Sequence, residues 1–146
     1  MTGEIDLDRL LLFMQPTLIS GEFVFCTVPD GRLEELSSLK PLACYHEEEG
    51  LSLILLKETA DEIKLSYNSV FRGITLSVHS SLDAVGFTAA VSNKLASNGV
   101  SANVVAAHFH DHIFVPAVKA EYAMELLTNF QEEASRTTAS TTIEPI

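Results

Sequence analysis

Apolar and polar side chains alternate strictly over residues 74–79, and apolar residues then recur every three or four positions. A period of two is typical of a strand with one buried face, and a period near 3.6 is typical of a helix. Ser80 or Ser81 can cap that helix, and Asn98 with Gly99 supplies a left-handed stop. The pattern therefore predicts a strand, then a helix from residue 82 to about residue 97.

Two further strands are expected after this helix. Residues 100–109 and 112–115 form the strands, and His110 with Asp111 forms the turn between them. A strand, a crossover helix and a second strand favour parallel strands, whereas the tight turn makes the third strand antiparallel to the second. If the third strand inserts between the first two, the segment opens a ferredoxin-like βαββαβ sandwich. The expected fold class is α+β, with helices on one face of an antiparallel sheet.

The first half of the chain has a similar order of elements. Its pattern predicts a helix capped by Asp6, a strand, a weak helical turn, a hairpin and a helix opened by the capping box Thr59-x-x-Glu62, over residues 7–15, 21–28, 32–39, 43–57 and 59–65. Each half alone would bury too little surface to be stable. We therefore expect two modules that share a core, residues 1–68 and residues 69–134.

The chain is expected to end with one more helix and a tail. After Pro116 an apolar stripe predicts a helix, formed by Ala120, Ala123, Met124, Leu127 and Phe130. Residues 135–146 are low in complexity and are expected to form a flexible, frayed tail, although residues 141–146 could dock as an edge strand.

The predicted helix over residues 82–96 is apolar over a wide arc. It carries two stripes, one of Leu82, Val85 and Ala89 and one of Phe87, Val91 and Leu95. A single sheet cannot cover both stripes. We therefore expect an interface on this helix, formed with the first module or with another subunit.

Charge and composition exclude several classes of protein. With 146 residues, 47% of them hydrophobic, the chain can bury a core, and its net charge of −11 argues against a nucleic-acid partner. No secretory signal and no apolar run of membrane-spanning length is present, so we expect a cytoplasmic protein without a membrane partner. Cys26 and Cys44 lie in apolar strand contexts and are expected to be buried, reduced thiols.

Four of the five histidines are expected at one edge of the predicted sheet. His79 ends the first strand, and His108, His110 and His112 surround the later turn. Zinc needs three or four converging ligands, so these four histidines are a candidate metal site. The alternative is a set of polar turn residues whose imidazoles are hydrogen-bonded to Asp111 and to the backbone, and this alternative is favoured. No cofactor is expected.

The turn that opens the predicted helix is the stronger candidate site. A strand-to-helix turn presents free N–H groups and the positive end of a helix dipole, which suits a carboxylate. The candidate ligand-binding residues are Ser80, Ser81, Leu82, Asp83, Ala84, Val85 and Gly86. The N–H groups of residues 81–83 would bind the carboxylate of an amino acid, and the side chain of Asp83 would pair with its ammonium group.

Four segments of the chain resemble a bacterial family of small stand-alone ACT-domain proteins. They are GEFVFCTV (residues 21–28), EEEGLSLIL (47–55), VHSSLDAVGFTAAVS (78–92) and NVVAAHFHDHIFVP (103–116). The resemblance covers about residues 7–127 and implies tandem ACT-like modules packed side by side, similar to the regulatory ACT modules of amino-acid kinases. In ACT domains, amino-acid ligands usually bind at the turn that residues 80–86 occupy here.

The function that this resemblance implies is regulatory and non-catalytic. The expected ligand is a small molecule, an amino acid above all, and the expected protein partner is a second copy of the chain or an enzyme. The chain has no room for a kinase domain, so that activity is not carried over. The alternatives are a small metal-dependent enzyme that uses the four histidines, and a purely structural dimerisation module.

Overall fold

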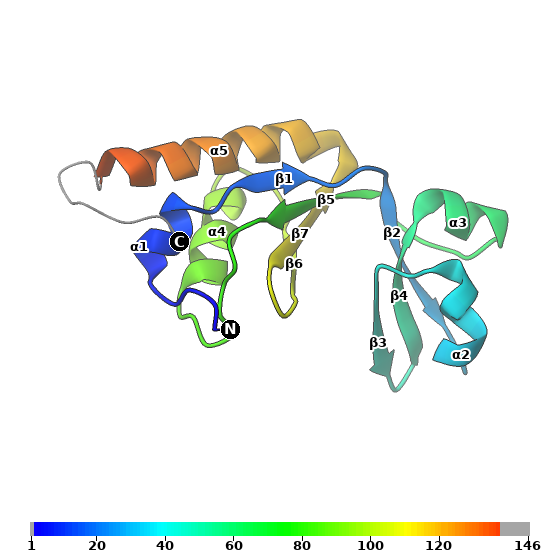
Figure 1. The fold of residues 1–146 in the computed structure, drawn as a ribbon. Helices are drawn as coiled ribbons and strands as arrows, with labels where there is room; N and C mark the ends of the chain where they lie inside the picture. The colour runs from blue at the N-terminus through cyan, green and yellow to red at the C-terminus, as the bar shows by residue number, and fades with distance from the viewer. Residues whose placement is uncertain (1, 138–146) are drawn as a thin grey trace. The chain divides into compact units, whose positions relative to one another are not determined.

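The computed structural model describes residues 2–137, which divide into two compact units. The inserted unit is Ser20–Arg72, and the split unit combines the residues before it, up to Ile19, with those after it, from Gly73 on. The elements of both units are labelled in Figure 1. The compact units therefore divide the chain differently from its two sequence halves, because the first helix packs with the second half of the chain.

The split unit is a sheet with helices on one face. Its elements are α1 (Leu7–Leu12), β1 (Pro16–Leu18), β5 (Phe71–Leu76, from Gly73 on), α4 (Phe87–Ala96), β6 (Asn103–Ala106), β7 (Asp111–Pro116), a 3-10 turn (Ala117–Lys119) and α5 (Ala120–Thr137). The order of neighbouring strands is β1, β5, β7, β6, and both the β1–β5 and β6–β7 pairs are antiparallel. β7 therefore lies between β5 and β6, as the ferredoxin-like prediction requires.

The core of the split unit follows from the alternation in its strands. Ile74 and Leu76 point to the helix-covered face of β5, where they join Leu10 of α1 and Leu95 of α4 in one buried cluster. The predicted stripe of the last helix is confirmed, since Ala120, Ala123 and Leu127 are buried in this cluster and Met124 and Phe130 pack against it.

The inserted unit has its own smaller core. Its elements are β2 (Phe23–Val28), α2 (Leu33–Leu36), a 3-10 turn (Ser37–Leu39), β3 (Ala43–Glu47), β4 (Gly50–Leu56) and α3 (Lys57–Glu62). β4 pairs antiparallel with both β2 and β3, so the predicted hairpin is confirmed. Every second residue of β2 and β4 faces the core, and Leu36, Leu39 and Ala60 from the helical segments cover it. The predicted α+β class with antiparallel strands is thus confirmed.

The start of the central helix was predicted wrongly. α4 begins at Phe87 after Gly86, whose φ of +95° is left-handed, and neither Ser80 nor Ser81 caps it. A left-handed residue interrupts the right-handed helical path, so residues 80–86 form a loop instead of the first turns. Leu82 and Val85 are consequently exposed and outside the helix, and the buried stripe of α4 is Phe87, Val91 and Leu95.

Other element boundaries also differ from the expectation. α3 begins at Lys57, directly after β4, so Thr59 lies inside the helix and forms no capping box. The strand expected over residues 100–109 is shorter in the structure, where β6 ends at Ala106. The chain turns at residues 107–110 instead of at His110 and Asp111, and the Ala107 N–H donates to the His110 carbonyl. α5 continues to Thr137, beyond the expected start of the tail. The strand β1 was not predicted, and the possible edge strand at residues 141–146 lies outside the described residues.

Both cysteines are free thiols, but only one is buried. Cys26 and Cys44 stand opposite the same residue, Leu53, on the two neighbours of β4. Among the described strands, β3 borders only β4, and Cys44 is exposed on it. The expectation that Cys44 is buried was therefore wrong, because a strand with a single neighbour leaves the side chain without cover.

Candidate functional site

The loop of residues 80–86 is held by backbone hydrogen bonds to distant parts of the chain. The Ser80 N–H donates to the Phe109 carbonyl (3.1 Å), and the Ser81 N–H donates to the Glu4 carbonyl (2.9 Å). The Asp83 N–H donates to the Ser81 hydroxyl (3.1 Å). Two of the three N–H groups that were expected to bind a carboxylate, those of residues 81 and 83, are therefore already bonded.

The side chain of Ser80 anchors the same loop to β7. Its hydroxyl donates to the Asp111 carboxylate over 3.1 Å. Ser80 is 5% exposed and Asp111 is 8% exposed, so the bond lies inside the protein. A buried carboxylate needs such donors, because its transfer from water is costly without them. Ser80 therefore holds the loop in place and is turned away from any surface ligand.

The outer part of the loop has a different character. Leu82 is 67% exposed and Val85 is 84% exposed, and Asp83 is exposed between them. Gly86 is the N-cap of α4 but has no side chain to cap the helix. Since the first N–H groups of a helix have no partner within it, the donors at this junction lie at residues 87–89. Of the predicted site residues, Leu82, Asp83 and Val85 are the ones whose side chains are available to a ligand.

The four candidate metal-binding histidines are near one another but do not converge. The rings of His79 and His108 are 6.5 Å apart, and Phe109 lies 4.9 Å from the first and 4.8 Å from the second. The ring of His110 is 6.4 Å from that of His112. Within the part of the chain that the structure describes, no three His, Cys, Asp or Glu side chains are arranged to hold a metal ion.

Two of these histidines have structural hydrogen bonds instead. His110 Nδ1 is 3.2 Å from the Val78 carbonyl, and His112 Nδ1 is 2.9 Å from the Thr75 hydroxyl. Burial, with a smaller contribution from the neighbouring His110, lowers the pKa of His112. The Thr75–His112 bond joins β5 to β7, so the imidazole contributes to the sheet.

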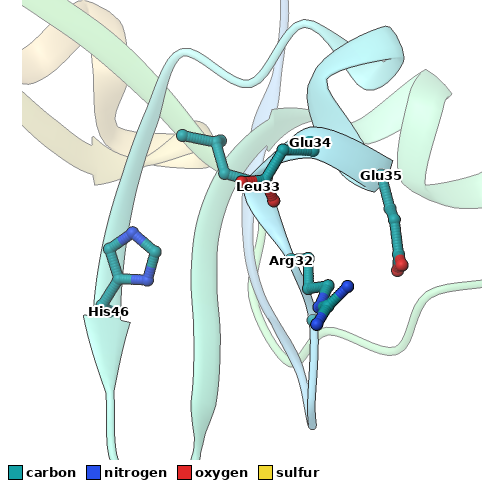
Figure 2. A pocket seen from close by; sticks show the side chains of 6 residues that line it. Arg32, Leu33, Glu34, Glu35 and His46 are labelled. Atoms are coloured by element: carbon teal, nitrogen blue, oxygen red, sulfur yellow. The ribbon is translucent and has the colours of Figure 1, made fainter.

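A surface pocket lies in the inserted unit, at the junction that follows β2. Its volume is about 710 Å³, and it is lined by Gly31, Arg32, Leu33, Glu34, Glu35 and His46. Figure 2 shows His46 on its strand across from the residues at the start of the short helix. The pocket thus brings a guanidinium and an imidazole into the same lining as two carboxylates.

The pocket was missed because its consecutive residues 31–35 showed no site pattern and nothing in the sequence placed His46 beside them. Residues 32–39 showed only a weak helical pattern, and His46 belongs to the following hairpin. One signal was present: the turn of Pro29, Asp30 and Gly31 follows the first long strand of its half, as the loop of residues 80–86 follows the strand of the other half.

A second, smaller pocket of about 470 Å³ lies at the start of α3 and is mainly acidic. Its cation, Lys57, forms an ion pair with Asp61 over 2.9 Å. Hydrogen bonds from Tyr67 and then Lys57 hold the pKa of Asp61 below its usual value. Lys57 is thus already paired with a carboxylate of the same lining, so this pocket suits an anionic ligand less well than the first. Among residues 2–137, no helix is both long and apolar enough to cross a bilayer.

Family models match nearly the whole chain. One ACT-domain model matches residues 2–72, and a second ACT-domain model matches residues 68–129. The two matches overlap at residues 68–72. Among curated proteins, no sequence matches the chain.

Several solved structures are similar to the chain. VC0802 from Vibrio cholerae, described as a protein of unknown function and possible transport protein, is 50% identical with a TM-score of 0.76, over 83% of this chain and 92% of that one. Atu0741 from Agrobacterium tumefaciens is 16% identical with a TM-score of 0.64, over 80% and 87%. The regulatory subunit of aspartate kinase from Thermus thermophilus is 11% identical with a TM-score of 0.53, over 78% and 95%. The last two likenesses concern the fold alone.

Proposed function

The chain belongs to the ACT-domain family, and we propose that it is a non-catalytic regulatory protein that binds a small molecule, in the first instance an amino acid. Tandem ACT modules support a ligand-binding regulatory role. The observation that carries the proposal is the pocket at the strand-to-helix junction of the inserted unit, whose lining has both signs of charge. A free amino acid carries the same two charges. We further propose that the protein acts in the cytoplasm and needs no cofactor.

The pocket supplies a partner for each end of an amino acid. Arg32 and His46 would bind the carboxylate, and Glu34 and Glu35 would bind the ammonium group. A guanidinium suits this role, because its planar donors match a carboxylate in a bidentate manner. The volume of about 710 Å³ lies within the range of ligand pockets, roughly 300–1,000 Å³.

The loop of residues 80–86 is the proposed second site. Its exposed side chains, Leu82, Asp83 and Val85, would contact the ligand, with Asp83 facing the ammonium group. The carboxylate would be bound by backbone N–H groups, those of residues 81–83 or those at the start of α4. Bound ligand would then change how the protein associates with a second copy of the chain or with a partner enzyme.

A thermal-shift screen with the twenty proteinogenic amino acids tests the proposal. An amino acid at about 100 times its dissociation constant stabilises the folded state by about 2.7 kcal/mol, which a melting curve resolves. Calorimetry then measures the affinity of variants for the amino acid that stabilises most. If no amino acid binds at millimolar concentration, the proposal is wrong.

Two pairs of variants assign the sites. Arg32→Ala should weaken binding in the pocket by about tenfold or more, since a hydrogen bond to a charged group is worth about 1.5–3 kcal/mol, whereas the exposed Arg136→Ala in the other unit should not. Asp83→Ala should weaken binding at the loop by about threefold to tenfold, with the exposed Asp8→Ala as its control. If each site variant binds the amino acid as tightly as its control variant does, neither the pocket nor the loop is the binding site.

A further inference from the structure

Residues 3–5 lie beside the loop of residues 80–86 as a short strap. The Glu4 N–H donates to the His79 carbonyl (2.8 Å), and the Ser81 N–H donates to the Glu4 carbonyl (2.9 Å). These bonds make a parallel bridge between Glu4 and Ser80. The strap therefore takes up hydrogen-bonding groups on both sides of Ser80.

The strap approaches the loop more closely than a side chain would allow. A Cβ placed on Gly3 would be 2.6 Å from the nitrogen of Ser81 and 2.7 Å from the carbonyl carbon of Ser80. Both neighbours are backbone atoms, which cannot move aside as the tip of a flexible side chain can. Any larger residue at position 3 therefore pushes the strap away from the loop.

The side chain of Glu4 ties the strap to α1. Its carboxylate accepts the N–H groups of Ile5 and Asp6 at 3.0 Å each and pairs with Arg9 Nε at 2.9 Å. The backbone bond from Asp6 and then the bond from Arg9 hold the pKa of Glu4 below its usual value. The strap is thus fixed at its α1 end, while its contact with the loop depends on two backbone bonds.

The strap buries little apolar surface against the rest of the split unit. Ile5 is 63% exposed, and Gly3 has no side chain to bury. Segments with few buried apolar contacts open locally, well below the free energy of global unfolding. The strap can therefore leave the loop while α1 and the core of the split unit stay folded.

We propose that this strap is a built-in competitor of the ligand at the loop of residues 80–86. The Glu4 carbonyl occupies the Ser81 N–H, one of the donors that a ligand carboxylate at the loop would use. Strap and ligand cannot both bond to this group, so a ligand carboxylate that uses the Ser81 N–H binds only to the fraction of molecules in which the strap is open. The apparent affinity is reduced by that fraction. The competition rests on the proposed function, whereas the opening of the strap does not.

Amide hydrogen exchange measured by NMR tests the opening. In the wild-type protein, the Ser81 amide should exchange at least about tenfold faster than the Leu95 amide in the core of α4. Gly3→Val should accelerate exchange at Ser81 further, by about fivefold or more, and leave Leu95 unchanged. Thr2→Val is the matched control, because Thr2 is exposed and outside the bridge. Equal exchange at Ser81 and Leu95 in all three proteins would overturn the strap.

Calorimetry with the amino acid that stabilises the wild-type protein most tests the competition. Gly3→Val should bind it at least about threefold more tightly, and Thr2→Val should bind as the wild type does. Glu4→Gln, which loses the ion pair with Arg9, should show a smaller gain in the same direction. Equal or weaker binding by Gly3→Val would refute the competition while the proposed function stands. If no amino acid binds any variant, the proposed function and the competition both fail, and the exchange rates still decide whether the strap opens.

Discussion

Replacing Ser80 by alanine would test whether its buried hydroxyl fixes the loop of residues 80–86. The hydroxyl donates to the Asp111 carboxylate at 3.1 Å, and both residues are buried. The alanine side chain cannot donate, so the carboxylate would stay inside the protein without this donor. The variant should therefore lose stability, although the replaced atom is small.

The expected loss follows from the energetics of charged hydrogen bonds. A hydrogen bond to a charged group contributes about 1.5–3 kcal/mol, and a buried acceptor that loses its partner costs a similar amount. Domains are stable by only about 5–15 kcal/mol. For a chain of this size, 1 kcal/mol corresponds to about 2–4 °C, so the melting temperature of Ser80→Ala should fall by about 3–12 °C.

Urea unfolding followed by circular dichroism measures this loss. Ser101→Ala is the matched control, because Ser101 is exposed, and it should change the free energy of unfolding by less than about 0.5 kcal/mol. Asp111→Asn retains an acceptor for Ser80 and should lose less stability than Ser80→Ala. If Ser80→Ala unfolds within about 0.5 kcal/mol of the wild type, the carboxylate does not depend on this hydroxyl, and the reasoning is refuted.

Three further predictions follow from burial. Burial raises the pKa of the Cys26 thiol, so iodoacetamide should label only the exposed Cys44 in the native protein and both after unfolding; mass spectrometry that finds two labels on native protein contradicts this. The lowered pKa of His112 means that protonation favours the unfolded state, so the stability of its neutral form is present above about pH 6.5 and is lost as the pH falls further. The melting temperature of His112→Gln should therefore fall less between pH 7.5 and 5.5 than that of the wild type. An equal fall in both proteins would contradict a contribution of His112 to this pH dependence. Leu95→Ala should cost about 2–5 kcal/mol because Leu95 is 0% exposed, whereas Leu82→Ala should cost less than about 0.5 kcal/mol, and equal losses in urea unfolding would contradict the position of the loop.

Local patterns predicted most elements of the fold. The alternation around Ile74 and Leu76 identified a strand with one buried face, and the turn at Gly50 identified the hairpin. The helical stripe from Ala120 to Phe130 identified the long last helix. These elements could be predicted because their periodicity comes from one face that is buried against a common core.

The start of α4 could not be predicted in the same way. Leu82 and Val85 have helical spacing with Ala89, on a stripe separate from the buried one, yet both are exposed in the loop. The backbone of this loop bonds to Glu4 and to Phe109, which are far away in sequence. No local pattern contains these partners. Ser80, which was predicted to cap the helix, is therefore instead buried and bonded to Asp111.

The two units differ in whether the hydrogen-bond donors at their strand-to-helix junctions are already bonded within the protein. In the split unit, the Ser81 N–H is bonded to Glu4, and the hydroxyl of Ser80 is committed to a buried carboxylate. In the inserted unit, the corresponding junction opens into a pocket lined by Arg32 and His46. A ligand carboxylate would therefore meet the Arg32 guanidinium at one junction and an N–H group that is already bonded at the other. If both junctions bind, the pocket of the inserted unit should fill first, and the loop of the split unit should fill only as its strap opens.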